Sequence, residues 1–292
     1  MKERIKHPVR ICMSYLCPKL LASIYYYNVS NRWINWKHPR DINEIINWLK
    51  FYGDTSMWPV LADKYRMRKY VEEKGLKNIL VKLYGVWENS NDIDFSKLPN
   101  SFVLKTNHGS GTNIIVKDKR VLDETSTRLQ LNEWLKLRFG QETVEFHYLK
   151  IKPVIIAEEL LVENNNSFSD TLVDYKVWCF NGKVHHIWAC YNRKEDYAYV
   201  GIYDKNWNYH PEGSVFNNHY RDGKGIVPKP SNLEDMLRAA ELLSEGHPQM
   251  RVDFYSIDGK LYIGEITMAS QGGYMDFYTK EFLEQMGNSV KL

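Results

Sequence analysis

The sequence predicts an α+β fold, in which a helical N-terminal third precedes a body rich in antiparallel strands. Three observations support this prediction. Apolar residues recur at helical spacing in residues 41–51, the hairpin signatures Asn181-Gly182 and Asp258-Gly259 lie in the second half, and no internal repeat interrupts this order. With 292 residues, the chain can form one large domain or a few smaller ones.

Charge is concentrated at the N-terminus. Residues 1–40 contain eight Lys and Arg against Glu3 alone, a net +7, so a total of +3 leaves −4 for the rest. The apolar run 11–27 is broken by Pro18 and Lys19, which argues against a signal peptide or a membrane span. This region predicts either a helix on the domain surface or a segment that contacts an anionic membrane face.

The overall composition is that of a globular protein, with 43% hydrophobic and 26% charged residues. The four cysteines have no zinc-type or Cys-x-x-Cys spacing, so we expect reduced thiols in a cytoplasmic protein. Basic residues beyond position 40 are not interleaved on one face, so no nucleic-acid partner is expected. Peripheral contact with the inner membrane face through residues 1–40 remains the open alternative for location.

Hydrophobic periodicity and turn residues predict the elements in order. In the first half we expect helices at 41–51 and 59–75, a strand at 78–86, a strand–loop–strand unit at 101–118, a helix at 124–139 and a buried strand at 152–162. In the second half we expect strands at 173–180 and 183–191, a long loop at 204–231, a helix at 232–246 and a final hairpin at 249–273.

The final hairpin carries two acids in apolar sequence. Counted away from the Asp258-Gly259 turn, Asp253 and Glu265 can fall on adjacent strands within reach of one ion, and Arg251 precedes the first of them. A carboxylate in such sequence is costly to bury unless it is paired or metal-bound. The alternative is a surface hairpin with two solvated acids.

Residues 105–113, KTNHGSGTN, place a lysine at the end of an apolar strand and a Gly-Ser-Gly turn after it. Glycines let backbone N–H groups approach an anion, and Lys105 supplies positive charge, so the stretch suits a phosphate clamp. It matches neither a Walker A sequence nor the dinucleotide fingerprint, and a plain hairpin turn remains an alternative. His108 could be a ligand, an acid–base group or neither.

Two further stretches could face a nucleotide. The buried strand 155–161 ends in Glu158 and Glu159, where backbone groups could read a purine edge and a carboxylate could accept ribose hydroxyls. Asp174 and Lys176 share one face of a predicted strand by the period of two. For both stretches, a core strand with solvated charges is the alternative. Carboxylates close to phosphate-binding lysines are also what Mg²⁺ requires.

In this order, the stretches resemble the ATP-grasp superfamily and, within it, the TupA-like ATP-grasp family, which is named from teichuronopeptide synthesis. The resemblance runs from about His38 to Gly273. It rests on HPRDINEIINWLKFY, LADKYRMRKYV, LPNSFVLKTNHGSGTNIIVKD, KPVIIAEELL, DYKVWCFNGK and RVDFYSIDGKLYIGEITMASQGG. It implies a basic helical region at 1–60, an ATP-grasp N-terminal subdomain with the Gly loop at 61–160, and a C-terminal subdomain with the metal site at 161–292.

The resemblance also implies roles for individual residues. The nucleotide would be bound by Lys64 and Lys105 at the phosphates, by the loop Gly109-Ser110-Gly111, by Glu158, Glu159 and Leu161 at the adenine and ribose hinge, and by Asp174 and Lys176. Asp253 and Glu265 would be the Mg²⁺ ligands, and Arg251 and Lys105 the catalytic residues. Thr267 stands where many superfamily members have Asn, and Ser270-Gln271-Gly272-Gly273 replaces a Pro-Gly-Gly loop, which leaves a second metal position open.

The function that the resemblance implies is an ATP- and Mg²⁺-dependent carboxylate–amine ligase of capsular, O-antigen or cell-wall polysaccharide biosynthesis. Its partners would be ATP, a sugar acid or polysaccharide precursor, and an amine. A glycosyltransferase with a metal motif at Asp92-Ile93-Asp94, a sugar kinase on the same fold, and a non-catalytic scaffold are the alternatives.

Overall fold

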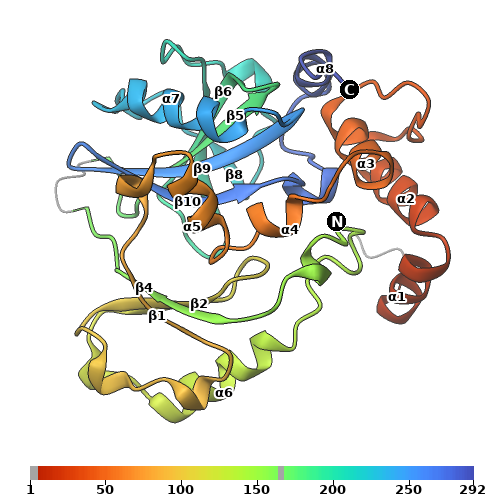
Figure 1. The fold of residues 1–292 in the computed structure, drawn as a ribbon. Coiled ribbons are helices and arrows are strands. Elements are labelled where there is room, and N and C mark those ends of the chain that lie inside the picture. Colours follow the sequence, from red (N-terminus) through yellow and green to blue (C-terminus); the bar gives the residue numbers. More distant parts are fainter. Residues whose placement is uncertain (1–5, 164–167) are drawn as a thin grey trace.

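The computed structural model describes residues 6–163 and 168–292, and these form two sheets with helices around them (Figure 1). The N-terminal region consists of α1 (His7–Leu16), α2 (Pro18–Ser30) and α3 (Ile42–Tyr52). The apolar run 11–27 is divided between α1 and α2. Pro18 is the first residue of α2, a position where its missing N–H costs no hydrogen bond. The Asp41 side chain caps α3 by accepting from the Glu44 amide.

The smaller sheet has the order β1-β4-β2-β3 and lies in the lower part of Figure 1. Its strands are β1 (Leu83–Trp87), β2 (Phe102–Thr106), β3 (Asn113–Val116) and β4 (Ile155–Glu158), all paired antiparallel. Helix α6 (Glu124–Leu135) packs against β2, and Leu131 joins Phe102, Leu104, Ile155 and Ala157 in a separate core. The predicted helix at 124–139 thus ends earlier, and the predicted strand at 78–86 begins only at Leu83.

The larger sheet has the order β10-β9-β5-β6-β7-β8. Its strands are β5 (Asp174–Phe180), β6 (Lys183–Tyr191), β7 (Ala198–Tyr203), β8 (Tyr220–Asp222), β9 (Gln249–Ile257) and β10 (Lys260–Thr267). All neighbours pair antiparallel except β7 and β8, which pair parallel. The predicted loop at 204–231 therefore contains β8, a strand of three residues that is too short for any period to mark.

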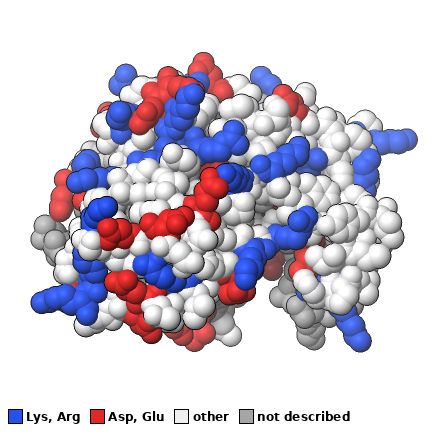
Figure 2. Space-filling model, turned by 60° about the horizontal axis from the view of Figure 1, so that its bottom comes forward, with Lys and Arg blue, Asp and Glu red and all other residues white. Residues whose placement is uncertain are grey.

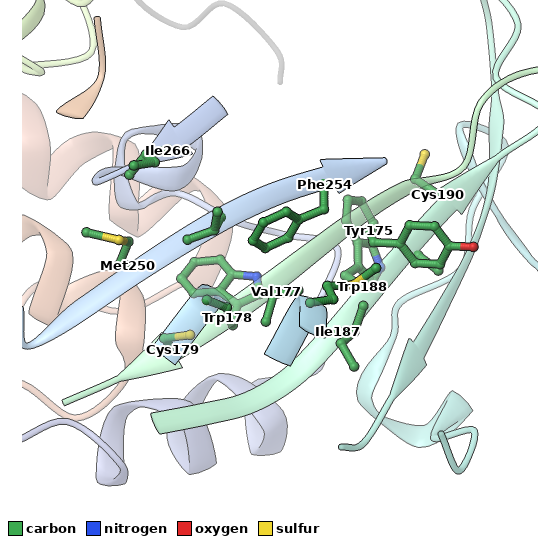
Figure 3. Packing of buried hydrophobic residues seen from close by; sticks show 14 of the residues in the cluster. Tyr175, Val177, Trp178, Cys179, Ile187, Trp188, Cys190, Met250, Phe254 and Ile266 are labelled. Atoms are coloured by element: carbon green, nitrogen blue, oxygen red, sulfur yellow. The ribbon is translucent and has the colours of Figure 1, made fainter. Parts of the chain in front are cut away.

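The two faces of the larger sheet differ in chemistry. Helix α7 (Leu233–Ser244) packs against β5, β6 and β9, and Tyr175, Val177, Cys179 and Phe254 belong to the large core that also includes residues of this helix (Figure 3). Side chains alternate along a strand, so Asp174 and Lys176 point to the opposite face. The face that carries Asp174 and Lys176 also holds the buried Trp178 and Trp188, so only part of it is left for charged groups.

The predicted helix at 59–75 is broken into α4 (Trp58–Leu61) and α5 (Met67–Glu73). Asp63 causes the break, because its carboxylate accepts from the amides of Tyr65 and Arg66 and so begins a new turn. Both helices contribute to the core of the larger sheet, although they precede the smaller sheet in sequence.

The N-terminal region is fixed to the C-terminal helix α8 (Lys280–Asn288) by ion pairs around the buried Asp41. Arg32 donates to Asp41 at 2.6 Å and to Glu284 of α8 at 3.0 Å. The Tyr26 hydroxyl donates to the same Asp41 oxygen at 2.7 Å, and α3 packs directly against α8. Among the described residues, no helix is long and apolar enough to cross a membrane.

We expect Tyr26→Phe to lower the free energy of unfolding by ~1.5 kcal/mol, because Asp41 loses a buried donor to a charged group but keeps Arg32. Urea unfolding at neutral pH measures this difference. Tyr52→Phe, at an exposed tyrosine whose hydroxyl accepts from Lys19 at the surface, serves as the control and should change stability by less than ~0.5 kcal/mol. Equal effects of the two variants would show that the Tyr26 hydrogen bond does not hold the N-terminal region.

Candidate active site

Three charged side chains form a row across neighbouring strands of the larger sheet. Lys176 on β5 is the register partner of Asp253 on β9, and Asp253 is the partner of Glu265 on β10. A β-bulge at Gly264 makes this alignment, because without the extra residue Gly264 would face Asp253 and Glu265 would point to the core. We call Lys176, Asp253, Glu265 and the adjacent Arg251 the charged row.

Arg251 is the centre of the charged row. Its Nε donates to Asp253 Oδ1 at 2.7 Å, and its Nη2 lies 2.8 Å from Asp253 Oδ2 and 3.3 Å from Glu265 Oε1. The same nitrogen donates to the Thr267 hydroxyl at 3.0 Å, and Nη1 donates to the Ser270 hydroxyl at 2.8 Å. The planar guanidinium is thus held by five contacts, which leaves its orientation little freedom.

The two acids of the row have different surroundings. The side chain of Asp253 is 3% exposed, and burial raises its pKa even though Arg251 and Lys176 oppose the rise. The side chain of Glu265 is 32% exposed, and although burial alone would raise its pKa, Lys64 and Arg251 lower it to about 2. Glu265 is therefore ionised at neutral pH and is the more accessible carboxylate.

Lys176 connects the row to Asp174 on its own strand. Its ammonium lies 2.5 Å from Asp174 Oδ2 and 2.6 Å from Asp253 Oδ2, and these two acids raise its pKa although burial would lower it. Arg193 approaches Asp174 Oδ2 at 3.4 Å from the adjoining strand end. Within the described part of the chain, the buried Asp174 Oδ1 has no hydrogen-bond partner.

Lys64 links the charged row to the smaller sheet. Its Nζ donates to the Gly109 carbonyl at 2.5 Å and lies 3.4 Å from Glu265 Oε2. Its backbone N–H donates to the Asn107 carbonyl at 3.0 Å, so both the main chain and the side chain of Lys64 contact the Gly loop. The structure thereby brings Lys64, Gly109 and Glu265 together, although each lies in a different part of the sequence.

The Gly loop has the backbone conformation for which glycine is needed. Gly109 and Gly111 have φ of 78° and 76°, and Ser110 between them is exposed. A Cβ on Gly109 would lie 2.7 Å from the Phe139 ring, so the loop also touches the segment after α6. His108 is buried, its Nε2 lies 3.1 Å from the Leu137 carbonyl, and burial lowers its pKa.

A second ion cluster lies on the smaller sheet. Glu158 at the end of β4 accepts from Lys105 of β2 at 2.5 Å and from Arg68 of α5 at 3.1 Å. Glu159 is half-buried, and its backbone N–H donates to the Lys82 carbonyl at 2.9 Å. Leu161 lies beyond the end of β4, and among the described residues no side-chain hydrogen bond joins Glu159 or Leu161 to the rest of the predicted set.

The donor set fits Mg²⁺ when ligand phosphates complete it. Within residues 6–163 and 168–292, no three Asp, Glu, His or Cys side chains converge as a site held by protein alone would require. Mg²⁺ commonly uses one or two carboxylates plus phosphate oxygens and water. Both contacts of Glu265 are long, at 3.3 Å and 3.4 Å, so its oxygens keep free lone pairs, whereas the oxygens of Asp253 accept from Arg251 and Lys176 at 2.6–2.8 Å.

The sequence did not indicate several residues of the site. Arg68 lies within the predicted helix at 59–75, where the sequence assigns it no role, yet it pairs with Glu158. Ser270 was noted only as a departure from the superfamily pattern, yet its hydroxyl holds Arg251. Arg68 could have been found from its place in the Asp-Lys-Tyr-Arg-Met-Arg stretch, but a lone Ser in a turn carries no such signal.

Two largely antiparallel sheets, one with a lysine and a Gly loop and the other with an acidic hairpin, define an ATP-grasp fold. A family model described as TupA-like ATPgrasp matches residues 44–291, and the chain belongs to this family. The predicted superfamily, family and fold are thus confirmed.

Solved structures that are similar to the chain include ligases. The D-alanine–D-alanine ligase from Bacillus anthracis complexed with ATP is 18% identical, with a TM-score of 0.40, over 72% of this chain and 54% of that one. The L-amino acid ligase from Bacillus licheniformis is 14% identical, with a TM-score of 0.47, over 80% of this chain and 50% of that one. The chain spans about half the length of both. No curated protein sequence matches it.

Asp253→Asn should destabilise the protein far more than Glu265→Gln. The first change removes a deeply buried charge that Arg251 and Lys176 share, which costs ~3 kcal/mol. The second removes a partly exposed charge with long contacts and should cost under ~1 kcal/mol. Urea unfolding of both variants measures the difference, and equal losses would contradict the different burial of the two acids.

Proposed function

We propose that the protein is an ATP- and Mg²⁺-dependent carboxylate–amine ligase that acts on a precursor of a surface polysaccharide. The observation that carries this proposal is the contact of Lys64 with both Gly109 and Glu265. It puts a cation between a loop suited to phosphates and a carboxylate suited to Mg²⁺. Membership of the ATP-grasp family supports ATP as the nucleotide, and Lys105 on β2 supplies a second cation near the loop.

The proposed reaction has two steps. A carboxylate oxygen of the sugar acid attacks the γ-phosphorus of ATP, the bond to the bridging oxygen breaks, and ADP leaves with an acyl-phosphate as the other product. The nitrogen of the amine then attacks the acyl carbon, the carbon–oxygen bond to phosphate breaks, and an amide, phosphate and a proton result. Positive groups are needed where charge develops in both steps, and Arg251, Lys64 and Lys105 provide them.

Bound Mg²⁺ would neutralise charge on the transferring phosphoryl group. Glu265 and Asp253 would hold it. Arg251 is fixed beside both acids and has further contacts to Thr267 and Ser270, so it can face the reacting group without reorganisation. Glu158, Glu159 and Leu161 at the end of β4 would bind adenine and ribose, and Asp174 and Lys176 would complete the nucleotide site.

Asp92 and Asp94, the acids of the motif that would favour glycosyl transfer, lie at the ends of short surface helices. Asp94 caps a short 3₁₀ helix by accepting from the Ser96 amide at 3.1 Å, and Asp92 is exposed beside α6. A metal for a nucleotide-sugar would require both carboxylates to point into one site. The positions of these two acids therefore favour ligase chemistry over glycosyl transfer.

Contact with the cytoplasmic membrane face is part of this proposal. On α1, Val9, Cys12 and Leu16 follow helical spacing and are exposed, and the side of the molecule where Figure 1 places α1–α3 is largely uncharged in Figure 2, with basic side chains at its edge. An apolar helix face within a segment of net charge +7 suits an anionic lipid surface. A lipid-linked sugar acid would be presented at such a surface.

Mg·ATP should stabilise the wild-type protein by ~2.7 kcal/mol at a concentration 100 times the dissociation constant, and EDTA should remove most of this effect. Incubation with Mg·ATP, a hexuronic acid and single amino acids should then give ADP, phosphate and an amide, detected by mass spectrometry. We expect Glu265→Gln to lower ADP formation at least ~100-fold, because the metal contributes several kcal/mol of charge stabilisation.

Glu88→Gln, at an exposed glutamate that pairs with Lys152, is the matched control and should keep full activity. A phosphosugar as product would assign a kinase instead. Consumption of a nucleotide-sugar in the absence of ATP would assign a glycosyltransferase. If Mg·ATP gave no thermal shift, the protein would be assigned as a non-catalytic scaffold.

The wild-type protein should sediment with vesicles of phosphatidylglycerol and phosphatidylcholine, but not with phosphatidylcholine alone. Leu16→Ser should weaken binding about tenfold, because burial of one leucine side chain contributes ~1.5 kcal/mol or more. Val121→Ser, at an equally exposed apolar residue of the smaller sheet region, is the control. Vesicle binding that changes neither with added salt nor with Leu16→Ser would contradict the membrane contact.

A further inference from the structure

Helix α3 carries a buried polar stripe. Asn43, Asn47 and Lys50 are separated by four and three residues, so they lie on one helix face. Asn43 and Asn47 are almost fully buried, and α3 otherwise presents isoleucine and leucine to the core. Buried amides and ammonium groups are costly unless they are hydrogen-bonded, so this stripe needs partners.

Its partners are backbone groups of the turn that follows β10. Asn43 both donates to the Met275 carbonyl at 2.9 Å and accepts from the Met275 amide at 3.0 Å. Asn47 donates to the Gly273 carbonyl at 2.9 Å, and Lys50 donates to the Gly272 carbonyl at 2.7 Å. All three side chains of the stripe therefore hold the same few residues of main chain.

The turn has a conformation that needs such support. Gln271, Gly272 and Gly273 have φ of 44°, 66° and 81°, three left-handed residues in succession. Gln271 has a Cβ and is strained there, and a strained backbone persists only when its surroundings determine it. At Gly273, a Cβ would lie 2.7 Å from the Asn47 amide nitrogen, so the turn and α3 are in close contact.

The turn is also connected to the charged row. Ser270, at its start, accepts from Arg251 Nη1 at 2.8 Å, and Arg251 in turn binds Asp253 and Glu265. The position of the turn therefore determines one of the anchors of the guanidinium. A shift of Ser270 would release Nη1, while the contacts to the two acids would remain.

Lys50 adds charge to this arrangement. It also approaches the Tyr274 hydroxyl at 3.2 Å, and the nearby Glu145 accepts from Thr143 at 2.5 Å. Burial lowers the pKa of Lys50 to about 7 and raises that of Glu145 to about 7, and each charge opposes the shift of the other. A buried pair of this kind contributes little net stability, so stability alone does not account for a lysine at this position.

We propose that Lys50 is a positioning residue, which holds the Ser270–Tyr274 turn so that Arg251 keeps the orientation needed by the transferring phosphoryl group. This inference rests on the proposed function. Lys50 contacts neither Lys64 nor the Gly loop in the described structure, so its loss should affect the transition state more than nucleotide binding.

Lys50→Met tests this with probes that need no acceptor. Mg·ADP measures nucleotide binding, and Mg·ADP with aluminium fluoride measures binding of a mimic of the transferring phosphoryl group. We expect the affinity for Mg·ADP to stay within about twofold, and the additional affinity given by aluminium fluoride to fall about tenfold. Amides of residues 271–275 should exchange hydrogen faster than in Lys74→Met, a control at a lysine that pairs with Glu245.

Ser270→Ala removes the contact between the turn and Arg251. It should likewise leave the affinity for Mg·ADP unchanged and lower the additional affinity given by aluminium fluoride, and it provides the test if Lys50→Met folds poorly. A parallel loss of both affinities, no loss of either, or unchanged exchange in the turn would overturn the proposal. Wild-type protein that binds no Mg·ADP would instead reject the proposed function, and the two failures are thus distinct.

Discussion

The architecture depends on how the larger sheet keeps carboxylates out of water. Asp253 is almost completely buried, and an isolated charge in that position would be too costly to keep. Arg251 and Lys176 both donate to it, and these cations are in turn shared with Glu265 and Asp174. The charges are therefore oriented by one another before any ligand binds. Electrostatic catalysis requires this kind of preorganisation, because no free energy is then spent on turning dipoles during the reaction.

The same constraint couples the two sheets. Glu265 is the acid of the row with the weakest internal contacts, and it lies at the edge that faces the smaller sheet through Lys64. Because Lys64 also holds the Gly109 carbonyl, a movement of the Gly loop changes the potential at Glu265 directly. On the smaller sheet, Lys105 is similarly paired with Glu158. Both lysines that are proposed to bind phosphates, Lys64 and Lys105, therefore already have an acidic partner. Anionic ligands would bind by exchanging these partners, which limits the net change in charge.

Much of this arrangement follows from local sequence, and the rest requires tertiary structure. The Asp258-Gly259 turn with alternating apolar residues predicts the hairpin, and the superfamily pattern predicts which acids matter. The alignment of Asp253 with Glu265 nevertheless depends on the bulge at Gly264, and a glycine within a strand only hints at a bulge. The break between α4 and α5 was missed because a side-chain hydrogen bond from Asp63 outweighs the helical period. Lys50 could not be identified, since a lysine near the end of an amphipathic helix usually faces solvent.

The polar stripe of α3 gives the N-terminal region a place in the chemistry of the site. The strands and the Gly loop determine where charges lie, but the turn after β10 is left with three left-handed residues and little intrinsic stability. A helix is a rigid support, and α3 is itself fixed by its Asp41 cap and by the ion pairs of Arg32 with Asp41 and α8. Its side chains can therefore resist the tendency of the turn to relax. If the turn relaxed, Arg251 would lose its Ser270 anchor and keep its contacts with Asp253, Glu265 and Thr267, and the two acids would then draw it away from an incoming phosphoryl group. On this argument, the N-terminal helices maintain the direction of the guanidinium, while the sheets supply its charge environment.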